Sequence, residues 1–123
     1  MGSTPTGKLP LILCIDDADI ALRVKKLLLA NAGYSVLTAN SAEAGFELFK
    51  ENTVDLVVSD HFLSLKTGTE IAKEMKQLKP EVPILIVSAA VEKPEGLEFA
   101  DGFLPKGEHA NVLLSAIAKL LGR

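Results

Sequence analysis

The chain has 123 residues, of which 48% are hydrophobic and 24% are charged, and its formal net charge is −3. This length and apolar content are typical of one globular domain and exclude an intrinsically disordered chain. The small negative charge gives no reason to expect nucleic acid or an anionic membrane surface as a partner. Cys14 is the only cysteine, so no internal disulfide can form and a reducing, cytoplasmic location is expected.

Apolar runs of strand length alternate with segments of helical periodicity along the chain. In chain order the pattern predicts strands over 9–15, 34–39, 54–59, 82–88 and 101–105, and helices over 18–31, 42–50, 66–79 and 108–121. The spacing of the first predicted helix is carried by Ile20, Val24, Leu27 and Leu28. Residues 1–8 are predicted to be a flexible leader to a single domain over 9–121.

Strands this apolar must be covered on both faces, which is typical of a parallel sheet between two layers of helices. We therefore predict an α/β fold with a doubly wound, five-stranded parallel sheet. Right-handed crossovers allow a few strand orders, and the order 2-1-3-4-5 places 9–15 beside 54–59 at the switch point where ligands bind. Pro94 and Gly96 interrupt the short connection between the last two strands, so the fourth helix is predicted to be short or irregular.

Polar residues stand at the carboxyl ends of four predicted strands. They are Asp16 and Asp17 after the first strand, Asp60 after the third, Ser88 at the end of the fourth and Lys106 after the fifth. Because the carboxyl ends of parallel strands share one edge of the sheet, these side chains are expected to converge. Three carboxylates, a hydroxyl and an ammonium suit a divalent cation together with a phosphoryl group.

Each of these residues also has an ordinary explanation. An aspartate after a strand often caps a helix or builds a turn, and a lysine is usually solvated. His61, beside Asp60, is expected to be an exposed neighbour rather than a catalytic base. Helix capping, however, gives no reason to combine an acidic doublet on one strand with a lysine on another. The joint pattern therefore favours a functional site.

These residues resemble the receiver domain of two-component response regulators, typified by the chemotaxis response regulator, over about 9–121. The resemblance rests on Asp16-Asp17, on Asp60 with Gly68 eight residues later, on Ser88 followed by small Ala89, and on Phe103-Leu104-Pro105-Lys106. It implies a flavodoxin-like fold. It also implies a phosphorylation-controlled signalling domain rather than an enzyme, apart from its self-catalysed acceptance and loss of a phosphoryl group.

The resemblance implies a role for each site residue. Asp60 is expected to be the phosphoacceptor. The implied Mg²⁺ ligands are Asp17, Asp60 and the Phe62 carbonyl directly, and Asp16 through water. Ser88 is implied to be the switch hydroxyl, and Ala89 to lie beside the bound group. Phe103 is the implied switch aromatic, and Lys106 is the implied cation that pairs with the phosphoryl group. The implied partners are a sensor histidine kinase or phosphotransfer protein and a downstream effector protein.

Two other functions stay open. A pseudo-receiver would have the same fold and bind a protein constitutively, although the intact Asp60, Asp17 and Lys106 argue against it. A small phosphohydrolase would use Asp60 as nucleophile, but phosphatases of that chemistry commonly place a second acid two residues later, where this chain has Phe62.

By family analogy Phe62 and Ala90 border the path of the hydrolytic water, and neither side chain can orient it, so a long-lived acyl phosphate is expected.

Overall fold

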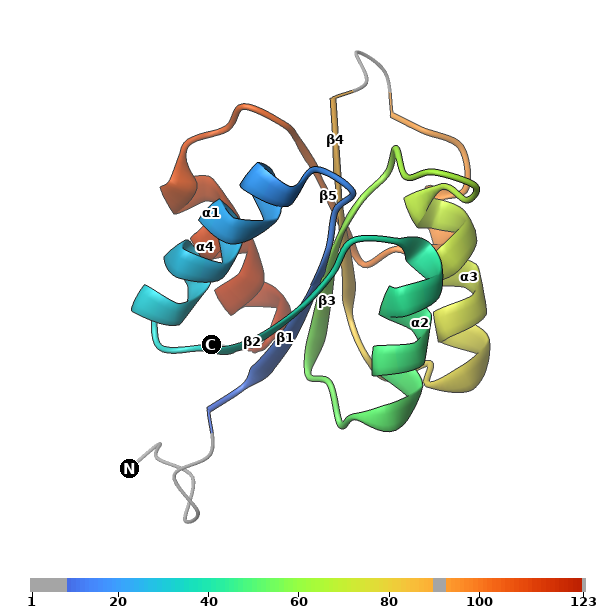
Figure 1. Ribbon diagram of the computed structural model, residues 1–123, viewed down its shortest axis with the longest axis horizontal. Coiled ribbons are helices and arrows are strands. Elements are labelled where there is room, and N and C mark those ends of the chain that lie inside the picture. The colour runs from blue at the N-terminus through green and yellow to red at the C-terminus, as the bar shows by residue number, and fades with distance from the viewer. Residues whose placement is uncertain (1–8, 90–92, 123) are drawn as a thin grey trace.

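The computed structural model describes residues 9–89 and 93–122 and has a parallel sheet between two layers of helices (Figure 1). The strands are β1 (Leu11–Ile15), β2 (Ser35–Ala39), β3 (Leu56–Asp60), β4 (Ile84–Ser88) and β5 (Gly102–Pro105). The helices are α1 (Asp19–Asn31), α2 (Ala42–Glu51), α3 (Gly68–Leu78), the 3₁₀ turn η1 (Leu97–Phe99) and α4 (Ala110–Leu120). The predicted leader, 1–8, and Ala90 lie outside the described residues.

The strand order is β2-β1-β3-β4-β5, and every neighbouring pair is parallel, so the predicted order and fold are confirmed. The register places Ile15 beside Ser59 and Asp60 beside Val87. All five carboxyl ends therefore lie along one edge of the sheet, at the top of Figure 1. The switch point of the fold lies at this edge, between β1 and β3.

Alternate residues of the central strands pack in two separate hydrophobic cores, one on each face of the sheet. Leu13, Val57 and Ile86 pack on the side covered by α2 and α3. Cys14 and Val58 pack on the opposite side, which is covered by α1 and α4 (Figure 1). This double coverage explains the continuous apolar runs of the strands. Burial raises the pKa of the Cys14 thiol to about 12, so Cys14 is an inert core residue.

The first helix is confirmed, but its apolar residues lie on both of its faces. Leu22 and Leu29 are buried against the sheet. Most of the residues that carried the predicted periodicity face solvent instead, with exposed fractions of 79% for Ile20, 59% for Val24 and 65% for Leu27. Helical spacing therefore identified the helix without identifying its buried face.

The connection between β4 and β5 contains the single 3₁₀ turn η1 among its described residues, so the prediction of a short or irregular fourth helix is confirmed. Gly96 precedes this turn with φ +84°, a left-handed conformation that favours glycine. Phe99 at its end packs against the α3 side of the core, where the Lys73 ammonium lies 5.5 Å from the centre of its ring.

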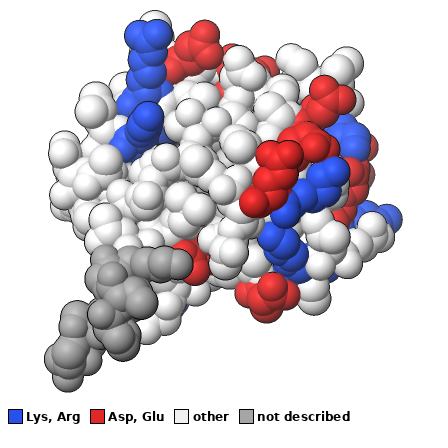
Figure 2. Space-filling model, turned by 60° about the horizontal axis from the view of Figure 1, so that its bottom comes forward, with Lys and Arg blue, Asp and Glu red and all other residues white. Residues whose placement is uncertain are grey.

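The face drawn in Figure 2 carries acidic and basic side chains intermixed along one side, and no broad basic area is visible on it. Mixed charge of this kind does not concentrate a field that attracts nucleic acid. None of the helices in the described part of the chain combines the length and the apolarity needed to cross a membrane.

Candidate functional site

Three carboxylates meet at the carboxyl edge of the sheet. Asp16 and Asp17 directly follow β1, and Asp60 is the last residue of β3, its neighbour in the sheet. One oxygen atom from each of the three side chains lies within 4.8 Å of the other two. Asp16 is fully buried and Asp60 is 3% exposed, whereas Asp17 faces solvent. The predicted convergence of the acidic doublet with Asp60 is thus present in the fold.

Lys106, just after β5, reaches across the edge of the sheet to this cluster. Its Nζ lies 2.8 Å from Asp60 Oδ2 and 3.9 Å from Asp16 Oδ2. Partial burial acts to lower the pKa of Lys106, but the hydrogen bond and charge of Asp60, with the charges of Asp16 and Asp17, raise it above its usual value. The ammonium is therefore held charged beside the carboxylate that was predicted to accept a phosphoryl group.

The donor set fits a hard divalent cation. Mg²⁺ binds oxygen ligands and usually takes a few carboxylates together with water. The exposed Asp17 leaves the cluster open to solvent, while the Asp16 and Asp60 carboxylates are buried at the edge of the sheet. The Phe62 backbone N–H donates to Asp60 Oδ1 at 3.3 Å, which holds the segment after β3 close to this carboxylate. A direct bond from the Phe62 carbonyl to the ion stays a prediction.

The remaining predicted residues surround the cluster. Ser88 is fully buried at the end of β4, one residue beyond the partner of Asp60 in the sheet. Its carbonyl accepts the Lys106 backbone N–H at 2.8 Å, so the two strand ends are joined. Ala89 is exposed just after β4, and Phe103 is half-buried on β5 against the α2 and α3 side of the core. Their roles toward a phosphoryl group stay predictions.

Glycine at position 68, which the resemblance singled out, is required for a steric reason. A Cβ atom at this position would lie 2.4 Å from the Asp60 carbonyl oxygen, closer than real Cβ atoms approach. The Gly68 N–H also donates to the His61 carbonyl at 2.7 Å. Glycine therefore lets α3 begin directly against the end of β3, which keeps the backbone around Asp60 compact.

The expectation that His61 is exposed was wrong, because His61 is only 7% exposed at the point where the chain leaves the sheet. Its ring packs edge-on against Phe62, with 5.0 Å between the ring centres. Burial lowers the pKa of His61 and outweighs the opposite effect of the charges on Asp60 and Glu70, so the imidazole is neutral at pH 7.

Lys25 is a site residue that sequence reasoning missed. It projects from α1 with its side chain 13% exposed, and its Nζ lies 3.1 Å from Asp16 Oδ2. A signal for it was present, since Lys25 stands three residues after Leu22 and four before Leu29, on the buried face of the helix. The periodicity of the exposed apolar residues concealed this face.

Comparison with known proteins agrees with this arrangement. A family model described as the response regulator receiver domain matches residues 12–118. The transcriptional regulatory protein RprY of Bacteroides fragilis is 32% identical over 94% of this chain, which spans 50% of the length of RprY. The chain thus corresponds to only half of this curated relative.

Solved structures show the same fold. The CheY-like receiver domain protein of Methanospirillum hungatei superposes with a TM-score of 0.88 at 27% identity, covering 94% of this chain and 95% of that one. The response regulator TrrA of Thermotoga maritima, solved in complex with Mg²⁺ and BeF, gives a TM-score of 0.87 at 25% identity, covering 91% of this chain and 99% of that one. With the match over most of its length, the chain belongs to the response regulator receiver domain family of two-component systems.

Proposed function

We propose that this chain is a phosphorylation-controlled signalling module in which Asp60 accepts a phosphoryl group and Mg²⁺ is the cofactor. The ion pair between Lys106 and Asp60, inside a cluster of three carboxylates, is the observation that carries the proposal. The ion pair places the Lys106 ammonium against the Asp60 carboxylate, which is the proposed nucleophile. The cluster of three carboxylates provides a site for a metal cation beside it. Receiver domains are signalling domains rather than classical enzymes, and this chain has the fold and the family match of one.

In the proposed reaction, a carboxylate oxygen of Asp60 forms a bond to phosphorus while the bond between phosphorus and the donor breaks. The leaving group departs with the electron pair of that bond. Lys106 exchanges its hydrogen bond to Asp60 for one to a phosphoryl oxygen. Asp17, Asp60 and the Phe62 carbonyl would hold Mg²⁺ directly and Asp16 would hold it through water, and the bound ion would supply the charge neutralisation that two approaching anionic groups need.

The phosphoryl group then changes the surroundings of Ser88 and Phe103. It adds roughly −1.5 to −2 of charge and strong acceptor oxygens, to one of which the Ser88 hydroxyl donates. We infer that the Ser88 side chain moves toward the phosphoryl group and frees space into which the Phe103 ring turns. The surface near β5 then differs between the phosphorylated and unphosphorylated states of Asp60. In this chain that surface includes η1 in place of a longer helix, so the effector must recognise a differently built face.

The partners follow from this function. The phosphoryl donor is a sensor histidine kinase or a phosphotransfer protein, and the reader is a downstream effector protein. The buried, unreactive Cys14 supports a reducing compartment, and we place the domain, over 9–121, in the cytoplasm.

Binding of beryllofluoride, which mimics a phosphoryl group on aspartate, tests the proposal. Adding it with Mg²⁺ to the isotope-labelled protein should shift the amide NMR signals of Asp60, Ser88 and Lys106 until the site is saturated. Beryllofluoride without Mg²⁺, and Mg²⁺ without beryllofluoride, are the controls. A spectrum that the combination does not change beyond the controls would favour the pseudo-receiver function instead.

The acyl phosphate is expected to decay slowly. Phe62 is 54% exposed beside Asp60, and its side chain cannot donate or accept a hydrogen bond to orient water. If water positioning at 62 and 90 is worth about 1.4 kcal/mol in the transition state, its loss slows hydrolysis about tenfold. Dephosphorylation of the wild type is to be timed beside the double variant Phe62→Asn with Ala90→Glu. Decay of the double variant no faster than wild type would rule out control at these positions.

A further inference from the structure

Lys25 holds an unusual place for a lysine. It lies on the sheet-facing side of α1, and its Nζ contacts Oδ2 of the fully buried Asp16 at 3.1 Å. A buried carboxylate that lacks a partner is strongly destabilising, so some cation must accompany Asp16 in the folded protein. Lys25 meets this need from within the chain.

Both oxygens of Asp16 have donors from the protein itself. Oδ1 accepts the Ala18 backbone N–H at 2.9 Å. Oδ2 faces Lys25 at 3.1 Å and Lys106 at 3.9 Å. Asp17, in contrast, accepts one hydrogen bond from the described residues, from the Ser64 hydroxyl at 3.4 Å. Asp60 is likewise engaged on both oxygens, by the Phe62 backbone N–H at 3.3 Å and by Lys106 at 2.8 Å. Asp16 is the fully buried carboxylate of the cluster, and Lys25 already engages its charge.

We propose that Lys25 is a resident counter-ion that competes with Mg²⁺ for Asp16 and thereby sets the metal affinity of the site. This inference rests on the proposed Mg²⁺ site. Two cations near one buried carboxylate repel each other strongly, because the interior screens charge less than water does. Binding of the ion must then displace the Lys25 ammonium from Asp16 or proceed against its charge.

The surroundings of Lys25 allow it to move. Lys25 and Lys106 both line a cavity of about 320 Å³, together with Val24 and Leu113. The ammonium can therefore swing away from Asp16 into this space while its alkyl stem stays against apolar side chains. The exchange of one cation for another needs no change in the backbone of α1.

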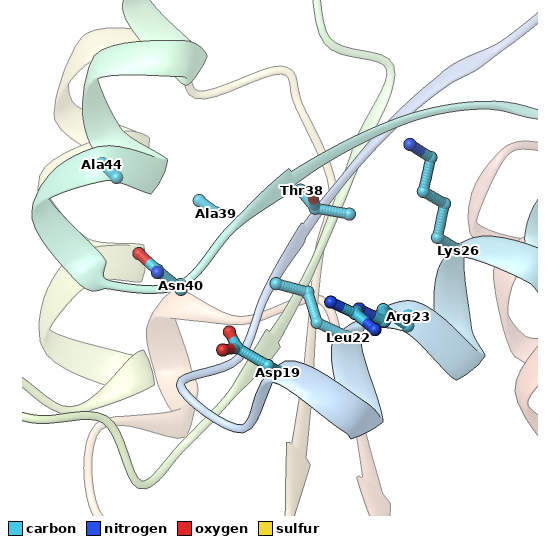
Figure 3. Close-up of a pocket in the computed structure, with 8 residues that line it drawn as sticks. All are labelled: Asp19, Leu22, Arg23, Lys26, Thr38, Ala39, Asn40 and Ala44. Atoms are coloured by element: carbon cyan, nitrogen blue, oxygen red, sulfur yellow. The ribbon is translucent and has the colours of Figure 1, made fainter.

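The neighbouring Lys26 provides a matched control. It is exposed and lines a different pocket of about 470 Å³ together with Arg23 and Thr38, between α1 and β2 (Figure 3). Replacing Lys26 removes the same charge from the same helix without touching Asp16. Any effect of net charge alone will therefore appear equally in both lysine variants.

The test is calorimetric titration of Mg²⁺ into the wild type and into the variants Lys25→Met, Lys25→Gln and Lys26→Met. Removing the competing charge should tighten Mg²⁺ binding about tenfold in both Lys25 variants, whereas loss of a solvated surface charge should change it less than about threefold. Lys25→Gln keeps a hydrogen-bond donor near Asp16, so it provides the answer if Lys25→Met does not fold. Thermal denaturation gives a second readout, since tighter binding means a larger rise in Tm on adding Mg²⁺.

The outcomes separate this inference from the proposed function. Tighter binding in the Lys25 variants alone supports the competition. Measurable Mg²⁺ binding that is equal or weaker in the Lys25 variants overturns the role of Lys25 and leaves the metal site standing. Failure of the wild type and of every variant to bind Mg²⁺ overturns both.

Discussion

Asp60→Asn is expected to abolish uptake of a phosphoryl group from acetyl phosphate or from a histidine kinase. The substitution keeps the shape of the side chain and its place at the end of β3, but an amide is not a nucleophile toward phosphorus. Incorporation should fall at least about a hundredfold, which corresponds to ~2.7 kcal/mol in the transition state. Intact-mass spectrometry after incubation with the donor and Mg²⁺ measures the phosphorylated fraction.

Asp55→Asn is the matched control for this experiment. Asp55 precedes β3 at the opposite edge of the sheet, where its Oδ2 accepts the Leu11 backbone N–H at 2.7 Å. The same change of acid to amide, directly before the same strand and away from the cluster, should leave phosphorylation at the wild-type level. Equal labelling of Asp60→Asn and wild type would remove Asp60 from the role of phosphoacceptor.

Asp17→Ala is expected to remove Mg²⁺ binding and, with it, phosphorylation. Asp17 is exposed, and within 9–89 and 93–122 its side chain accepts only the long hydrogen bond from Ser64, so its loss should change the free energy of unfolding by no more than about 0.5 kcal/mol. Loss of one of the few carboxylate ligands should weaken Mg²⁺ binding by about a hundredfold or more. Calorimetry measures the affinity, and thermal denaturation shows that the variant is folded.

Asp19→Ala controls for the loss of an exposed acid nearby. Asp19 lies in the first turn of α1 and borders the pocket of Figure 3 rather than the carboxylate cluster. Its removal should cost the helix a few tenths of a kcal/mol and leave Mg²⁺ affinity within about threefold. If Asp17→Ala bound Mg²⁺ as tightly as Asp19→Ala does, Asp17 would not be a ligand.

The core of the site could be predicted from the sequence because the fold class and its strand order determine it. Once the strands are recognised as parallel, Asp17, Asp60 and Lys106 must share an edge, wherever their helices pack. The short η1 turn was likewise predictable, since Pro94 and Gly96 leave little room for a helix.

Features that depend on tertiary packing were not identified from the sequence. The orientation of α1 about its own axis decides whether Lys25 meets Asp16, and apolar residues on both faces of that helix left the orientation open. The burial of His61 depends in the same way on how closely α3 approaches β3, a contact that Gly68 permits.

The position of the phosphoryl group tests the central claim most directly. The wild-type protein is to be incubated with acetyl phosphate, with Mg²⁺ or with a chelator, then treated with borohydride, which reduces an aspartyl phosphate, and mapped by peptide mass spectrometry. We predict that the reduced residue is Asp60, and that it forms only when Mg²⁺ is present. Modification of another residue, or equal modification of Asp60 in the chelator, would contradict the proposed phosphoacceptor site.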